Sequence, residues 1–255
     1  SKLLTFVMMP VYTYSLATGE YGNFNLIVQT ANLLMPVVTV GMSQAIIRFG
    51  VDRSYSRPDV FSTSFYSTVA AFLALLCFSP LLGMMGFLGK YTWLLMLYVL
   101  MSSFRQICSQ FTRAKGATKL FALDGMISTA TTCLFTIIFL LGFHMGVTGA
   151  LLAVILSDFL SILFLFWAAS LYRYLRLRGI NRITWKSMLK FALPLIPTQI
   201  FWWIVSVSDQ YLVAFMISDS ANGIYAAAYK VPTILMVVAT IFMDAWQISA
   251  VQENN

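Results

Sequence analysis

The chain has 255 residues, of which 60% are hydrophobic and only 10% charged, with a mean hydropathy of +0.82. Soluble domains carry about 25% charged residues, so this composition excludes a water-soluble globular protein and predicts one that has lipid as its solvent. The net charge of +7 does not indicate a nucleic-acid partner, because the basic residues lie at the ends of apolar stretches and form no aromatic-interleaved patch.

Apolar stretches alternate with short polar breaks along the whole chain. A helix of about 20 apolar residues crosses the ~30 Å hydrocarbon core of a bilayer, and irregular backbone cannot face lipid. We therefore predict an all-α, polytopic membrane helix bundle in which about eight transmembrane helices are present. The predicted spans are 1–16, 23–47, 60–82, 91–112, 120–141, 147–171, 191–217 and 224–250.

Lysine and arginine gather at every second break. The breaks after the second, fourth and sixth spans carry twelve basic residues, whereas the alternate breaks carry only Lys90. The twelve are Arg48, Arg53, Arg57, Arg113, Lys115, Lys119, Arg173, Arg176, Arg178, Arg182, Lys186 and Lys190. By the positive-inside rule these breaks are cytoplasmic. The first span is already under way at Ser1 and lacks the features of a signal peptide, so we expect a longer protein whose N-terminus is also cytoplasmic.

An offset of 201 residues aligns the second predicted span with the eighth and places Gly22 on Gly223. Both copies run in the same direction, which predicts two lobes related by an axis along the membrane normal. The predicted division is a first six-helix lobe at 1–172, a cytoplasmic basic linker at 173–190 and the first two helices of a second lobe at 191–255. The basic linker is either a topology determinant lying along anionic lipid or a segment that also attracts an anionic lipid substrate.

Ionisable residues within the spans are costly and usually face a partner or a wet cavity. The candidates are Arg105, Asp124, Asp158, Asp209, Lys230 and Asp244. Asp209 and Lys230 both lie ~12 Å below the outer surface on consecutive antiparallel helices, so they are placed to pair. Arg105 and Asp124 lie at similar depths from the cytoplasmic side and are also placed to pair. Each pair is either a structural ion pair or part of a transport cavity.

Asp158 lies near mid-depth of the sixth span, where we expect no charged neighbour at its level. It either binds a coupling ion, H⁺ or Na⁺, or is a neutral acid hydrogen-bonded to a neighbouring helix. Asp244 lies close to the inner boundary. The three cysteines fall within apolar spans and His144 is the single histidine, so no disulfide framework, no metal site and no cofactor is expected.

Several motifs occur in order along the chain. They are LATGEYG at 16–22, GMSQA at 41–45 followed by Arg48, KFALPLIP at 190–197, SDQ at 208–210, GIY at 223–225 and AYK at 228–230. This set resembles the Wzx-type polysaccharide or O-antigen flippases of the multidrug/oligosaccharidyl-lipid/polysaccharide exporter superfamily. The family often has Arg before the first outer turn and after the motif Asp, where this chain has Tyr12-Thr13-Tyr14 and Gln210.

The resemblance implies a two-lobed transporter of about twelve to fourteen helices that works by alternating access. It implies no enzyme activity. The expected function is flipping of an undecaprenyl-pyrophosphate-linked oligosaccharide to the outer leaflet of the bacterial cytoplasmic membrane, coupled to H⁺ or Na⁺. Expected partners are this lipid-linked oligosaccharide, membrane lipids and polysaccharide polymerase machinery. Arg105, Lys230 or Arg48 would meet the pyrophosphate as charge-assisted donors.

Other functions remain open. A drug/cation antiporter and a lipid II flippase belong to the same superfamily, although the Tyr-Gly turn, the Pro-Leu-Ile-Pro span and the Gly-Ile-Tyr motif argue against the antiporter. The chain could also be a non-transporting scaffold or receptor, or an integral membrane glycosyltransferase. The outer breaks are too short to house a set of catalytic acids, which argues against the enzyme.

Overall fold

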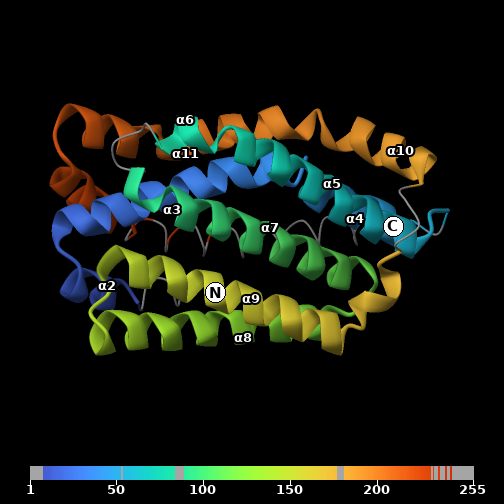
Figure 1. Ribbon diagram of the computed structural model, residues 1–255, viewed down its shortest axis with the longest axis horizontal. Helices are drawn as coiled ribbons and strands as arrows, with labels where there is room; N and C mark the ends of the chain where they lie inside the picture. Colours follow the sequence, from blue (N-terminus) through green and yellow to red (C-terminus); the bar gives the residue numbers. More distant parts are fainter. Residues whose placement is uncertain are drawn as a thin grey trace.

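The computed structural model describes residues 8–52, 54–83, 89–176 and 181–230, together with Pro232, Leu235, Ala239 and Phe242. This part of the chain is all-α, as predicted, and its long helices run along the longest axis of the molecule (Figure 1). The α-helices are α2 (Met9–Ser15), α3 (Thr18–Val38), α4 (Met42–Val51), α5 (Arg57–Cys77), α6 (Ser79–Gly83), α7 (Thr92–Ala114), α8 (Thr118–Ile137), α9 (Gly146–Ala168), α10 (Arg182–Ala192) and α11 (Leu195–Met216). Shorter turns are η1 (Gly89–Tyr91), η2 (Ile138–Gly142) and η3 (Leu171–Tyr174), and residues 219–230 form a further helix, called helix 219–230 below.

The chain is a multi-pass membrane protein. In the described residues four helical stretches are long and apolar enough to cross a bilayer: 57–77, 118–142, 146–168 and 182–216. Helices α3 and α4 pass the same test together and give a fifth span. The predicted spans 1–16 and 224–250 lie partly outside the described residues. Helix α7 is 23 residues long but falls short on hydropathy, because it carries Arg105, Arg113 and several hydroxyl and amide side chains.

The predicted span 23–47 is a bent pair of helices and not one straight helix. Helices α3 and α4 meet at an angle of 49°. Pro36 removes a backbone donor near the end of α3, and Gly41 adopts the left-handed φ of +63° just before α4. A Cβ atom at Gly41 would lie 2.9 Å from the carbonyl oxygen of Ala192. Because Gly41 has no side chain, the end of α10 can approach the start of α4 closely.

Half of the predicted basic linker is an amphipathic helix. Helix α10 begins at Arg182. Along it a buried residue recurs every four positions on one face, and an exposed basic residue recurs every four positions on the other. The buried residues are Thr184, Met188 and Ala192. The exposed basic residues are Arg182, Lys186 and Lys190. Met188 joins a core cluster with Ile46 of α4 and Phe111 of α7, so α10 is docked on the bundle by its apolar face.

The basic breaks gather at one end of the bundle. In Figure 1 helix α10, the α7–α8 turn and the end of α4 lie at the right, whereas α2, α6 and the α8–α9 connection lie at the left. The basic breaks that follow α4 and α7, and helix α10, therefore lie near the right end, whereas η1 lies beside α6 towards the left end. This arrangement agrees with the predicted threading of the chain, in which the right end is cytoplasmic.

The two glycines aligned by the internal repeat meet at the end of the bundle opposite the basic breaks, which is the predicted outer end. A Cβ atom on Gly22 of α3 would lie 2.3 Å from the carbonyl oxygen of Asp219, and one on Gly223 would lie 1.9 Å from that of Thr18. Thr18 and Asp219 are themselves 201 residues apart, so the contact is reciprocal. Asn222 adds a hydrogen bond from its side-chain amide to the carbonyl oxygen of Gly22, at 3.3 Å. Only glycine allows two helix backbones to approach this closely.

Replacing Gly223 by alanine should therefore separate α3 from helix 219–230. The added methyl group meets backbone atoms that cannot move aside, so we expect a loss of about 1–3 kcal/mol in the free energy of unfolding. Gly125→Ala is the matched control, because nothing lies within 4 Å of a Cβ atom at this position of α8. Thermal unfolding of the two purified variants in detergent compares them. Equal midpoints in both variants would contradict the close crossing.

Candidate functional site

Arg105 on α7 lies between two buried carboxylates on neighbouring helices. Its Nη1 atom is 3.2 Å from Oδ1 of Asp158 on α9, and its Nη2 atom is 3.8 Å from Oδ2 of Asp124 on α8. The aspartate side chains are 4% and 1% exposed, whereas the arginine side chain is 30% exposed. These three residues, called the ion triad below, tie α7, α8 and α9 together.

The ion triad confirms one sequence prediction and corrects another. The predicted pair of Arg105 and Asp124 is present. The expectation that Asp158 has no charged neighbour is wrong, because Arg105 reaches it as well. Helix α7 ends at Ala114 and α9 at Ala168, so Arg105 and Asp158 lie nine and ten residues from the same end of the bundle. The predicted spans ended at 112 and 171, which wrongly put the two residues at different depths.

Three serines complete the hydrogen bonds of the ion triad. Ser102 donates to Asp158, and Ser161 donates to Asp124. The Nε atom of Arg105 donates to the hydroxyl of Ser161 at 3.1 Å, and Ser109 donates to Asp124 at 3.2 Å. Buried charges need such partners because they have lost their hydration. The guanidinium is therefore held in one orientation by groups behind it.

The exposed edge of Arg105 faces a cavity of about 350 Å³. The cavity is enclosed by α2, α3, α7, α8, α9 and helix 219–230, and Lys230 contributes a second cation to its wall. Its full lining is Met8, Tyr12, Tyr21, Phe24, Asn25, Val28, Tyr98, Arg105, Ser128, Thr129, Thr132, Cys133, Val154 and Lys230. Among these described residues there is no carboxylate, so the wall presents positive charge, hydroxyl groups and aromatic rings.

Most of the aromatic residues of this wall come from α2 and α3. The ring of Tyr12 stacks on Phe24 with centroids 5.3 Å apart and lies 6.3 Å from the ring of Tyr21. The hydroxyl of Tyr12 also shares a hydrogen bond of 3.3 Å with Thr136 of α8. Tyr12 lies in the stretch Tyr12-Thr13-Tyr14, where the Wzx-type flippases often have arginine. At this position the cavity wall therefore presents an aromatic ring in place of a cation.

A cluster of hydroxyl groups backs the opposite wall. Thr131 and Thr132 of α8 each lie 2.8 Å from the hydroxyl of Ser157 on α9, and Ser157 donates to the carbonyl oxygen of Ser128 at 2.7 Å. The cluster packs α8 against α9. It also positions Ser128 and Thr132 at the cavity.

The remaining predicted site residues lie elsewhere. Asp209 is exposed on α11 and accepts a hydrogen bond from Tyr225 at 3.4 Å, so its pairing with Lys230 stays a prediction. Arg48 is exposed at the inner end, where its guanidinium lies 4.6 Å from the ring centroid of Phe191. Asp244 lies outside the described residues. In the described part of the chain no three His, Cys, Asp or Glu side chains come close enough to hold a metal ion.

Most of the neutral residues of this site were not predicted from the sequence, among them Tyr12, Asn25, Tyr98 and Ser102. A weak signal was available, since Tyr21, Phe24, Asn25 and Val28 recur at helical spacing on one face of α3. The same spacing is found in ordinary core helices. Only the neighbouring helices reveal that this face borders a cavity.

The sequence matches one protein family over nearly its whole length. Residues 1–247 match the model of a family described as "Polysaccharide biosynthesis protein". A search of curated proteins found no match. The chain is similar in structure to the inward-facing conformation of a multidrug resistance MATE family transporter of the MOP superfamily, with a TM-score of 0.72 and 18% identity over 93% of this chain and 59% of that one.

Two further MATE structures show the same likeness. One is a MATE in complex with MaL6, with a TM-score of 0.65 and 18% identity over 90% of this chain and 56% of that one. The other is a MATE in the straight conformation, with a TM-score of 0.62 and 18% identity over 92% and 58%. The chain has a MATE-like transporter fold and spans somewhat more than half the length of these proteins. The predicted resemblance to a polysaccharide family is confirmed by the family match, and the likeness to the MATE structures, at 18% identity, shows the fold alone.

Removing the cation of the ion triad should destabilise the protein strongly. Arg105→Gln leaves Asp158 and Asp124 buried without their counter-charge, which costs about 3–5 kcal/mol for a broken buried pair. Adding Asp158→Asn should restore part of this loss. The control is Arg176→Gln, which breaks the exposed pair with Asp59 and should cost less than about 1 kcal/mol. Unfolding midpoints of the purified variants measure the effect, and an Arg105→Gln midpoint equal to the control would contradict the ion triad.

Proposed function

Because this chain belongs to the polysaccharide biosynthesis protein family, we propose that it flips an undecaprenyl-pyrophosphate-linked oligosaccharide from the cytoplasmic to the outer leaflet of a bacterial cytoplasmic membrane. The family and the transporter fold indicate membrane transport related to polysaccharide export. The nature of the substrate is inferred from the cavity, in which Arg105 and Lys230 are surrounded by hydroxyl groups and aromatic rings without a carboxylate among the described lining residues.

This lining fits the two parts of a sugar pyrophosphate. Guanidinium and ammonium groups donate charge-assisted hydrogen bonds to phosphate oxygens, and the fixed fork of Arg105 suits a bidentate contact. Hydroxyl and amide side chains such as Thr132 and Asn25 can exchange hydrogen bonds with sugar hydroxyls, while Tyr12 offers an aromatic face. An organic cation, the substrate of a drug antiporter, would find only the N–H donors of Arg105 and Lys230 at the wall, because Asp158 and Asp124 are not among the lining residues. The cavity thus favours the flippase over the antiporter.

Transport requires two lobes that move against each other. In the proposed division residues 1–172 form the first lobe, 173–190 the linker and 191–255 the start of the second lobe, with α2, α7 and helix 219–230 as further membrane spans. The reciprocal contact of Gly22 and Gly223 supports this proposal, since a two-fold axis between equivalent helices produces such a contact. The lobes would then be closed at the outer end, and separating the glycines would open the cavity outward.

The ion triad supplies a place for ion coupling. Two buried carboxylates share one guanidinium, so the ionised triad carries one excess negative charge in a low-dielectric environment. Binding of H⁺ or Na⁺ at Asp158 or Asp124 would neutralise this charge. Because Arg105 belongs to both the ion triad and the cavity wall, a change in the charge of the carboxylates would alter how strongly Arg105 holds a phosphate. Coupling through Arg105 is part of the proposal.

Complementation of a gene deletion tests the function. The complete gene should restore surface polysaccharide and prevent accumulation of lipid-linked oligosaccharide in the inner leaflet. Lys230→Ala should reduce polymer export at least tenfold, because a charge-assisted hydrogen bond to the phosphate is worth more than about 1.4 kcal/mol. Arg176→Gln is the control for a lost surface cation, with expression of both variants measured in membranes.

Different outcomes separate the rival functions. Normal polymer export by Lys230→Ala together with Arg105→Lys would refute the role of the cavity. A deletion strain with unchanged polysaccharide and increased drug sensitivity would replace the flippase by an antiporter. Loss of cell-wall synthesis instead of surface polymer would indicate a lipid II flippase.

A further inference from the structure

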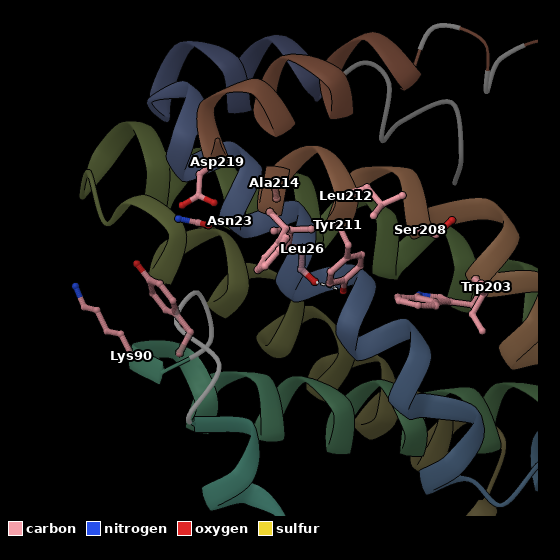
Figure 2. A pocket seen from close by; sticks show the side chains of 12 residues that line it. Asn23, Leu26, Lys90, Trp203, Ser208, Tyr211, Leu212, Ala214 and Asp219 are labelled. Atoms are coloured by element: carbon pink, nitrogen blue, oxygen red, sulfur yellow. Dashed lines mark hydrogen bonds between the residues drawn. The ribbon is translucent and has the colours of Figure 1, made fainter. Parts of the chain in front are cut away.

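A second and larger cavity, of about 830 Å³, lies at the seam between α3 and α11 (Figure 2). Its wall is built by side chains of α11 that are tied to the backbone of α3. The Nε1 atom of Trp203 donates to the carbonyl oxygen of Gln29 at 2.8 Å, and the hydroxyl of Tyr211 donates to that of Leu26 at 3.1 Å. The two rings lie 5.4 Å apart. The cavity therefore lies where hydrogen bonds join α11 to α3, and this contact region is called the seam below.

The cavity is polar at one end and apolar along the rest of its length. Figure 2 shows Asn23, Asp219 and Lys90 at one end, and Trp203 and Ser208 at the other. Between them the lining is mostly apolar and, among the described residues, forms an open groove, with Leu212 55% and Phe215 93% exposed. The polar end lies at the outer end of the bundle, because η1 and the start of α3 lie there.

The length of the cavity matches one leaflet of a bilayer. The lining residues of α11 run from Trp203 to Phe215, a stretch of ~18 Å at 1.5 Å per residue. Half of a bilayer, including its headgroup layer, is ~20–22 Å thick. A lipid of the outer leaflet would thus place its headgroup at Asn23, Lys90 and Asp219, and an acyl chain along Leu212 towards Trp203.

The charges at the polar end select the headgroup. Lys90 is the one basic residue of the outer breaks, and the carboxylate of Asp219 lines the same cavity. A phosphate accepts hydrogen bonds from Lys90 and Asn23, whereas Asp219 attracts a cation and repels a headgroup that is only negative. We propose that this cavity binds a zwitterionic phospholipid with a primary amine in its headgroup, of the phosphatidylethanolamine class. Its phosphate meets Lys90 and its ammonium group meets Asp219.

Such a lipid would bridge α3 and α11 and stabilise the arrangement in which they are joined. A ligand that binds one arrangement better than another shifts the population towards the first by its difference in affinity. The amine-bearing lipid of the outer leaflet is therefore a regulator of the seam. This inference does not depend on which substrate the central cavity carries.

Lipid binding to the delipidated, complete protein in detergent tests the proposal. Native mass spectrometry and thermal shift would be recorded with phosphatidylethanolamine, phosphatidylglycerol and undecaprenyl phosphate of matched concentration. We expect phosphatidylethanolamine to bind at least tenfold more tightly than phosphatidylglycerol and to raise the unfolding midpoint, and to bind equally well when undecaprenyl phosphate occupies the central cavity. Equal or tighter binding of phosphatidylglycerol, or displacement of phosphatidylethanolamine by undecaprenyl phosphate, would overturn the proposal.

Single variants identify the groups that recognise the headgroup. Lys90→Gln should weaken phosphatidylethanolamine about tenfold, and Asp219→Asn should abolish the preference over phosphatidylglycerol. Ala214→Phe should fill the apolar part and reduce binding of all lipids. Lys186→Gln, which removes an exposed cation at the opposite end of the bundle, is the matched control and should bind as the unchanged protein does. Unchanged affinity in both charge variants would refute the assigned headgroup site, whereas Ala214→Phe tests the acyl-chain path separately.

Discussion

The contact of Arg105 with Asp158 and Asp124 is the interaction on which the architecture of the first helices depends. Each of these charges would be costly in a bilayer if it stood alone, and together with their serine partners they satisfy one another. Because the three residues come from α7, α8 and α9, the same contacts that neutralise the charges also fix the packing of these helices. Arg105 then presents its free edge to the central cavity as a positioned donor.

Polar contacts also organise the boundary between the two parts of the chain. Asn25 of α3 donates to Gln210 of α11, and Thr30 shares a hydrogen bond of 2.7 Å with Tyr211. Such bonds can be broken and formed again at lower cost than a close-packed apolar core. The Gly22–Gly223 crossing adds close van der Waals contact at the outer end of the same boundary. A seam of this kind is suited to proteins whose halves must separate and rejoin.

The two cavities differ in the chemistry of their walls. The central cavity, lined by Arg105 and Lys230, is enclosed by helices of both parts of the chain, and its wall also carries hydroxyl groups and aromatic rings. The cavity between α3 and α11 is, among the described residues, an open groove that is mostly apolar except at one end. The difference follows from position, because a path for a hydrated headgroup must replace water by polar side chains, whereas a groove in contact with acyl chains need only match their shape. The proposed transport of a lipid-linked sugar would use both kinds of surface.

Composition and charge pattern determined the membrane environment, the helical class, the end at which the basic breaks gather and the pairing of Arg105 with Asp124. These follow from local requirements, namely the length of an apolar helix and the cost of moving lysine and arginine across a membrane. The sequence alone did not place Asp158 beside Arg105, because depth was counted from helix ends that lay two or three residues away from the observed ones. It also did not show the bend at Gly41 or the role of Tyr12 and Asn25. Apolar and small residues look alike on a buried face and on a face that borders a cavity, and only the packing of neighbouring helices decides between them.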